Sequence, residues 1–210
     1  MEFSVLRPCF YEKPTIELAQ ELIGKLLVKK TDEETLVARI VETEAYLGTN
    51  DRAAHSFGNR RTKRTDVMFG PPGYIYTYLM HTHCLINVVG GQIDQPEAVL
   101  IRAVEPIAGM EEMQKRRGSL KRDVDVTNGP GKLTKAMGIT MEVYGEPCWG
   151  ENLFIANGEK PSSIMASRRI GIDGSGEAVD YLYRFTSPQS RFVSGTKKQN
   201  NGIILNREEQ

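Results

Sequence analysis

The sequence predicts an α+β fold, in which a mixed, mostly antiparallel and curved sheet is flanked by helices. Strand-like and helix-like segments are mixed along the chain, and the first strand-like segments are joined by connections of hairpin length. No internal repeat and no Gly/Ser-rich or Pro-rich linker divides the 210 residues. We therefore expect a single domain over 1–210, with a polar tail at 196–210 that frays.

The first elements follow from periodicity. Residues 15–25 have apolar positions at helical spacing after Thr15, which suits an N-cap. Residues 26–29 and 35–44 alternate β-branched and polar side chains, which predicts two strands, and the polar segment 30–34 between them suits a hairpin.

The later elements follow the same two periods. Residues 73–89 read as a strand with tyrosines at every second position, and 97–104 and 181–186 read as further strands. Residues 109–118 and 130–137 suit helices.

Composition restricts the class of protein. With 40% hydrophobic and 26% charged residues, the chain resembles an ordinary soluble globular protein. Its three cysteines, Cys9, Cys84 and Cys148, are too few and too scattered for a disulfide framework. We find no signal peptide and no stretch near the roughly 20 apolar residues of a membrane span. These features predict a cytoplasmic protein without a membrane partner.

Charge alone does not indicate the partner. Basic and acidic residues both number 27, so the net charge is zero, which counts against nucleic-acid binding without excluding it. A phosphate responds to the local field rather than to the total charge. If the chain binds DNA, we expect a shallow dependence of affinity on salt.

The segment 39–55 carries the clearest chemistry. On a strand, Glu42, Glu44 and Tyr46 share one face, and His55 ends the loop that follows. Two carboxylates, an aromatic ring and an imidazole suit an acid/base pocket. Acidic residues on a strand equally suit a solvated face, so the segment alone leaves both interpretations open.

A basic loop at 59–64 precedes Tyr74, Tyr76 and Tyr78. Cations beside aromatic rings suit a site that neutralises phosphates and stacks on a base, although the tyrosines equally suit an ordinary sheet face. The segment 128–133, NGPGKL, can present N–H groups to a phosphate or simply begin a helix, and it lacks the P-loop spacing.

A metal site is not expected. His81, His83 and Cys84 lie close in sequence, but the adjacent His83 and Cys84 would point to opposite faces of a strand. A structural zinc site needs four ligands, and His55 is the one histidine left.

Together these blocks resemble the alkyladenine (3-methyladenine) DNA glycosylase family, in a bacterial member. The resemblance runs from about Pro8 to Ser194 in one order. It rests on the blocks RIVETEAYLG, AAHS, MF with a PG turn, YxY, Asn87, VLIRAVEP, NGPGKL and RRIG, which are specific in combination and weak singly.

The resemblance implies roles for individual residues. Glu44 matches the general base that activates water, and Arg102 and the backbone carbonyl of Ile170 match groups that hold this water. Tyr46 and Tyr78 match the aromatic walls around a flipped base. The remaining matches are His55 at the base edge, Asn87 as the group that excludes guanine, and Arg60, Thr62, Lys132 and Gly171 as contacts to the DNA backbone.

One segment departs from the family pattern. The family has a tyrosine in a hairpin that wedges into the duplex, whereas this chain has the shorter segment 79–83 without a tyrosine. Met80 and His81 are the candidates for the wedge, because apolar side chains serve this purpose elsewhere.

The resemblance implies a monofunctional, monomeric glycosylase that needs no cofactor and works on the nucleoid. It would flip alkylated or deaminated purines from duplex DNA and hydrolyse the bond to the sugar. Two other functions stay open on the residues alone. One is a hydrolase of nucleosides or small glycosides, against which the basic loop counts. The other is a non-catalytic lesion-binding protein, which has no use for carboxylates in its pocket.

Overall fold

The computed structural model describes residues 2–31 and 33–206. This part of the chain holds three α-helices, α1 (Thr15–Glu21), α2 (Met110–Arg117) and α3 (Pro130–Met137). Its strands are β1 (Leu26–Lys30), β2 (Thr35–Tyr46), β3 (Ile75–Met80), β4 (His83–Gly90), β5 (Glu97–Ala108), β6 (Leu153–Ala156), β7 (Ser163–Ser167), β8 (Arg184–Thr186) and β9 (Ile203–Asn206).

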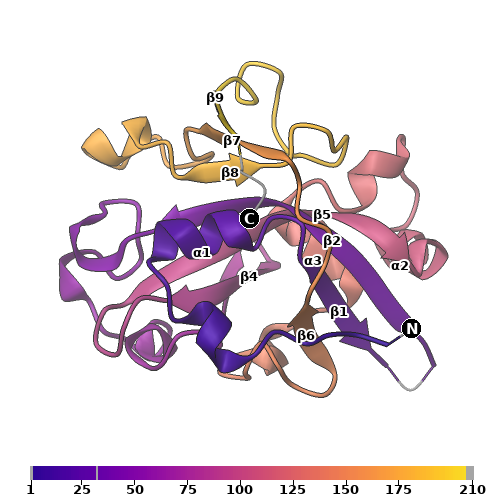
Figure 1. The fold of residues 1–210 in the computed structure, drawn as a ribbon, viewed down its shortest axis with the longest axis horizontal. Helices are drawn as coiled ribbons and strands as arrows, with labels where there is room; N and C mark the ends of the chain where they lie inside the picture. The colour runs from indigo at the N-terminus through magenta and orange to yellow at the C-terminus, as the bar shows by residue number, and fades with distance from the viewer. Residues whose placement is uncertain (1, 32, 207–210) are drawn as a thin grey trace.

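All the strands belong to one curved sheet in which every described pairing is antiparallel, which confirms the α+β prediction. The order is β3-β4-β5-β2-β8-β7-β9, and β1 joins β2 to β6. The long strand β2 pairs with β5 along one edge and with β1 and then β8 along the other. In Figure 1, β2 and β5 run side by side through the middle of the molecule.

Side chains alternate between the two faces of this sheet, and each face has its own environment. On one face Val41 and Ala45 join the main hydrophobic core, which also contains residues of α1 and α3. The Thr43 hydroxyl, on the same face, donates to the Ala19 carbonyl of α1 at 2.8 Å. The opposite face of β3, β4 and β5 supports a second cluster of Met68, Tyr76, Tyr78, Leu85, Val89, Ala98 and Leu100. The helices therefore cover one face and leave the other face of β2 for polar residues.

The structure corrects several predicted boundaries. The first helix ends at Glu21, and Pro14 rather than Thr15 is its N-cap, so Thr15 is the first helical residue. The segment 73–89 is not one strand, because the chain reverses at His81 and Thr82 between β3 and β4. Of the predicted strand 181–186, only Arg184–Thr186 pairs with the sheet.

The prediction of a frayed tail is wrong for much of 196–210. Ile203–Asn206 forms β9 and pairs with β7, and Asn200 binds a buried arginine. Figure 1 shows this C-terminal segment, in yellow, folded back beside β7 and β8. Residues 207–210 lie outside the described residues. In the described part of the chain the three cysteines are free, and none of the helices is long and apolar enough to cross a membrane.

Candidate active site

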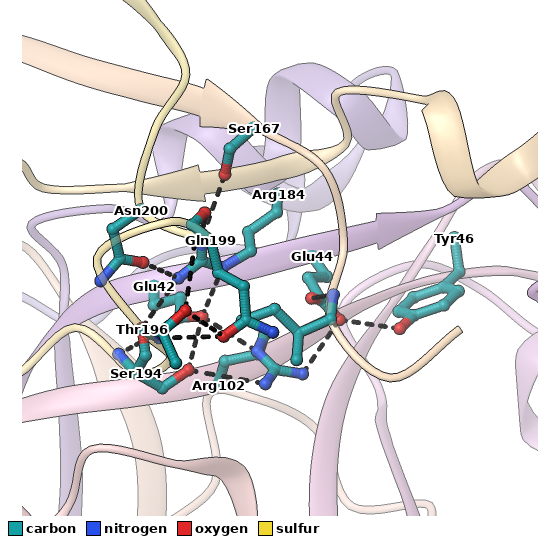
Figure 2. Close-up of polar contacts among 11 residues, drawn as sticks. Glu42, Glu44, Tyr46, Arg102, Ser167, Arg184, Ser194, Thr196, Gln199 and Asn200 are labelled. Carbon is teal, nitrogen blue, oxygen red and sulfur yellow. Dashed lines mark hydrogen bonds and ion pairs between the residues drawn. The ribbon is translucent and has the colours of Figure 1, made fainter. Parts of the chain in front are cut away.

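The polar face of β2 carries two glutamates that are both completely buried. Strand alternation places Glu42, Glu44 and Tyr46 on this face, as expected from the sequence, and β5 adds Arg102 opposite them. Arg102 bridges the two carboxylates, because its Nε donates to Glu42 at 2.9 Å and its Nη1 donates to Glu44 at 3.2 Å. Figure 2 shows the arginine between the two glutamates.

Glu44 receives three donors. Oε2 accepts the Tyr46 hydroxyl at 2.8 Å and Arg102 Nη1, and Oε1 accepts the backbone N–H of Ile170 at 2.8 Å. An ionised carboxylate has about four acceptor positions. Among the described residues three of these are used, so one position on Oε1 remains for a further donor.

Glu42 is held differently. Its Oε1 accepts Arg102 Nε, Arg184 Nε at 2.7 Å and the Ser194 hydroxyl at 2.9 Å, and its Oε2 accepts the Ser194 N–H at 2.7 Å. Burial would raise the pKa of Glu42, but the charges of Arg102 and Arg184 outweigh it and lower this pKa below its ordinary value. Glu42 is therefore an ionised group enclosed by four protein donors, three on Oε1 and one on Oε2.

Arg184 anchors this ion cluster from β8, and its side chain is completely buried. Besides Glu42, its guanidinium donates to the Ser167 hydroxyl and to the Ser194 carbonyl, both at 3.0 Å. It also reaches the C-terminal segment, where the Gln199 carbonyl accepts at 3.0 Å and Asn200 Oδ1 at 2.7 Å. Figure 2 shows these contacts converging on one side chain.

A pocket of about 550 Å³ opens beside Glu44. All three of the donors to Glu44 line it, so the carboxylate lies directly behind the pocket wall. The structure brings together most of the predicted site residues here, since the lining includes Tyr46, His55, Tyr78, Met80, Asn87, Arg102, Ile170 and Gly171.

Aromatic rings form much of the pocket. The Tyr78 ring stacks on Tyr76 with centroids 5.5 Å apart and meets the His55 ring edge-on at 4.5 Å. The Arg169 guanidinium lies 4.7 Å from the centre of the Tyr46 ring and covers one face of it. Tyr46 also lines the pocket, so its ring is part of the pocket wall.

The titratable groups of the pocket are mostly neutral. Burial, and next the charge of Glu44, raise the pKa of Tyr46 well above its ordinary value and that of Tyr78 to about 12. Burial, and next the charge of Arg64, lower the pKa of His55 to about 4. At neutral pH the pocket thus combines uncharged aromatic walls with the Glu44–Arg102 pair.

Two of the pocket contacts tie the predicted residues to a tyrosine that the sequence did not single out. His55 Nδ1 and the Tyr76 hydroxyl are hydrogen-bonded at 2.8 Å, and Asn87 Nδ2 donates to the Tyr76 carbonyl at 3.0 Å. The sequence predicted Tyr76 only as one of three tyrosines on the same face of a strand. Of the other two, Tyr74 packs against the Trp149 ring.

Arg169 is a second residue that the sequence reasoning missed. It is buried and makes a bidentate ion pair with Asp51, at 2.5 and 2.8 Å, and its Nη1 donates to the Ala45 carbonyl at 2.8 Å. It fixes both the Tyr46 ring and the start of the loop that carries Ile170. The sequence around Arg169 does not indicate these contacts, because Asp51 and Ala45 lie more than one hundred positions away.

The predicted DNA-backbone residues are spread around the pocket rather than inside it. Gly171 lines it, while Arg60 is exposed and the Thr62 hydroxyl bonds to Thr65. Lys132 Nζ contacts Asn128 at 2.7 Å and Asp125 at 3.3 Å, so it is held near the start of α3.

The two wedge candidates lie at the tip of the β3–β4 hairpin. Met80 lines the pocket and is 43% exposed, and His81 is exposed in the turn itself. His81 and Thr82 both have positive φ, 46° and 72°, which is unusual for residues other than glycine. Such strain concentrates at functional sites.

The described residues include no group of three or more His, Cys, Asp or Glu that could hold a metal ion. His83 and Cys84 are adjacent on β4, in the arrangement that argued against a metal.

Comparison with known proteins shows which family and which relatives this chain is similar to. A family model described as methylpurine-DNA glycosylase matches residues 9–191. A Bacillus licheniformis protein named "Putative 3-methyladenine DNA glycosylase" is 60% identical over 185 residues, covering 88% of this chain and 94% of the relative. Proteins of the same name from Oceanobacillus iheyensis and Listeria monocytogenes are 54% and 44% identical, covering 91% and 94% of this chain and 96% of each relative.

Proposed function

The chain belongs to the methylpurine-DNA glycosylase family, and from this premise we propose that it releases alkylated and deaminated purines from duplex DNA by a Glu44-activated water. The family makes it an N-glycosylase, a hydrolase that acts on DNA. The observation that carries the finer proposal is the buried Glu44 carboxylate, held by Tyr46, Arg102 and Ile170 behind an aromatic pocket.

The base must leave the duplex to reach this carboxylate, at a cost of a few kcal/mol of unstacking. The Tyr46 and Tyr78 rings in the pocket wall would receive it, and each stacking contact is worth about 1–3 kcal/mol. Electron-poor rings such as methylated purines gain most from stacking on tyrosine. Met80 or His81, at the hairpin tip, would fill the space that the base leaves.

The bond between base and sugar breaks through a state with positive charge on the sugar, as in glycoside hydrolysis. Water attacks the sugar carbon, Glu44 takes a proton from that water, and the bonding electrons leave with the purine. The unused acceptor position on Glu44 Oε1 suits this proton transfer, and the carboxylate charge also stabilises the sugar cation. Arg102 and the Ile170 carbonyl would hold the water.

Selection among purines would fall to His55 and Asn87. His55 is neutral at pH 7 and bonded through Nδ1 to Tyr76, so its Nε2 has no hydrogen-bond partner among the described residues. It can therefore contact a base edge. Asn87 is anchored through its amide nitrogen, and we propose that it excludes guanine by a clash with the 2-amino group.

The product would be an abasic site in an unbroken strand, because the proposed chemistry uses water and no lysine adduct. We propose further that the enzyme works as a monomer in the cytoplasm, at the nucleoid, on duplex DNA and without a cofactor. Arg60, Thr62, Lys132 and Gly171 would hold the DNA backbone around the pocket.

The test is single-turnover release of purines by the full chain from matched duplexes that carry 3-methyladenine, 7-methylguanine, hypoxanthine or ethenoadenine. The free nucleosides of the same bases are the comparison. We expect release from the duplexes, no release from the nucleosides, and a strand that breaks only after alkali. Equal action on free nucleosides would indicate a nucleoside hydrolase, and tight binding without release would indicate a lesion-binding protein.

A further inference from the structure

A second hollow lies next to the base pocket, and we call it the C-terminal groove. Its volume is about 800 Å³, and its lining comes mainly from two segments, 168–173 and 196–201. It shares Ile170, Gly171 and Ile172 with the base pocket, so the two hollows meet along one wall. The family model ends at 191, so it does not assign the second segment.

The groove is cationic in a chain with zero net charge. The two segments contain four basic residues and one acidic residue, Asp173. Arg169 is neutralised by Asp51, and the exposed Arg168 pairs with Asp180 at 2.8 Å. Lys198 lines the groove, and Lys197 is its neighbour in sequence and does not line it. Both are exposed and have no ion pair or hydrogen bond of their side chains in the part of the chain that the structure describes. Their charges are available to a ligand.

The lysines stand on a segment whose conformation is fixed. Gln199 Oε1 accepts the Thr196 N–H at 2.9 Å, and the Asn200 N–H donates to the Thr196 carbonyl at 3.0 Å. Arg184 holds the Gln199 carbonyl and the Asn200 side chain from below. A preorganised cationic loop loses little conformational entropy when it binds an anion.

The wall between the two hollows is open at Gly171. Gly171 is exposed, has φ +80°, and no heavy atom lies within 4 Å of the position that a Cβ would occupy. A polymer backbone can approach the main chain closely at such a position. A flipped nucleotide keeps its phosphates outside the base pocket, and the shared wall leads from there into the groove.

We infer that the C-terminal groove binds the phosphodiester backbone of the DNA strand that flanks the flipped nucleotide, with Lys197 and Lys198 neutralising phosphates. This inference rests on the proposed function, because it takes the base pocket as the place of the flipped nucleotide. The expected total salt dependence is small, so one or two phosphate contacts are a large share of it.

The test compares Lys197→Gln/Lys198→Gln with Lys29→Gln/Lys30→Gln, a control that removes the same charge from β1, on the other side of β2 from β5. Affinity for a hypoxanthine duplex is measured between 50 and 200 mM salt, a range over which the Debye length falls to about half. Each lysine that contacts a phosphate should reduce the slope of log affinity against log salt by about 1. We expect this reduction in the groove variant and not in the control.

Uncharged methylphosphonates at single positions then locate the contact. At one or two positions beside the lesion they should weaken binding of the wild type and of the control, and leave binding of the groove variant unchanged. Equal slopes for groove variant and control, or equal methylphosphonate effects, would overturn the inference. Single-turnover purine release at saturating enzyme is measured alongside: no release by the wild type would refute the proposed function, independently of the binding result.

Discussion

Glu42 and Glu44 lie two residues apart on the same face of β2, both with no exposed surface, yet their surroundings differ. Glu42 has four donors in the ion cluster with Arg184 and Ser194. Glu44 has three donors in the described residues, and all three of them line a pocket. The difference between the two buried carboxylates is therefore the pocket beside Glu44.

Arg102 couples the two regions. It donates to both carboxylates, and the charges of Glu44 and Glu42 outweigh its burial and raise its pKa above the ordinary value. With Arg184 the four charges sum to zero. The cluster around Glu42 therefore fixes the guanidinium that faces Glu44. We expect substitutions in the cluster to lower mainly stability, and substitutions beside Glu44 to lower mainly the rate of purine release.

The largest expected effect on stability comes from Arg184→Met. Removing one partner of a buried ion pair costs about 3–5 kcal/mol, because the other charge stays buried without compensation. The matched control is Arg122→Met, which removes an exposed bidentate pair with Asp125 and should leave the free energy of unfolding near the wild-type value. Denaturant unfolding measures both variants. Equal losses for the two would contradict the structural role of the ion cluster.

A smaller effect is expected on the Glu44 side from Tyr46→Phe. The change keeps the ring and removes the hydroxyl that donates to Glu44 at 2.8 Å. A hydrogen bond to an ionised group is worth about 1.5–3 kcal/mol, which corresponds to roughly ten- to hundredfold in rate if the full bond supports the reaction. Single-turnover release should fall by that amount, while Tyr74→Phe, outside the pocket, should keep the wild-type rate. A wild-type rate in Tyr46→Phe would show that the Tyr46 hydroxyl does not support Glu44 in the reaction.

A further effect concerns pH. The pKa of His55 is lowered from 6.5 to about 4 in the folded chain, so between these values the unfolded chain binds more protons. Stability therefore rises with pH across this window, and it falls as the pH drops from about 6.5 to about 4. His55→Gln should flatten this part of the profile of unfolding free energy against pH. An unchanged slope in the variant would show that other groups cause it.

The regular parts of the fold follow from local patterns. The hairpin of β1 and β2, strand β5 and helix α3 carry clear periodicity, and the structure contains them together with the predicted helix α2. The β3–β4 turn could not be predicted, because two-residue turns with positive φ normally use Asn or Gly, and here His81 and Thr82 adopt it. The short β9 was missed because the tail is polar overall, although Ile203 and Ile204 are β-branched residues that suit a strand.

The site divides in the same way. Alternation on β2 predicted that Glu42, Glu44 and Tyr46 share a face, and most of the site residues that the family resemblance named line the pocket. Neither signal separates the carboxylate that the ion cluster encloses from the carboxylate that lies behind the pocket wall. That difference depends on Arg184 and Ser194, which lie more than 140 positions away in sequence and reach Glu42 only in the folded chain.

The most direct test of this division is single-turnover purine release by Glu44→Gln and Glu42→Gln, with unfolding free energy and lesion-duplex affinity measured on the same preparations. We expect Glu44→Gln to lose roughly 10²–10⁴-fold in rate, the usual contribution of a general base, while the variant stays folded and keeps its affinity for the lesion duplex. Glu42→Gln should lose mainly stability. Purine release by Glu44→Gln at the wild-type rate, or an equal loss of rate in a fully stable Glu42→Gln, would contradict the account.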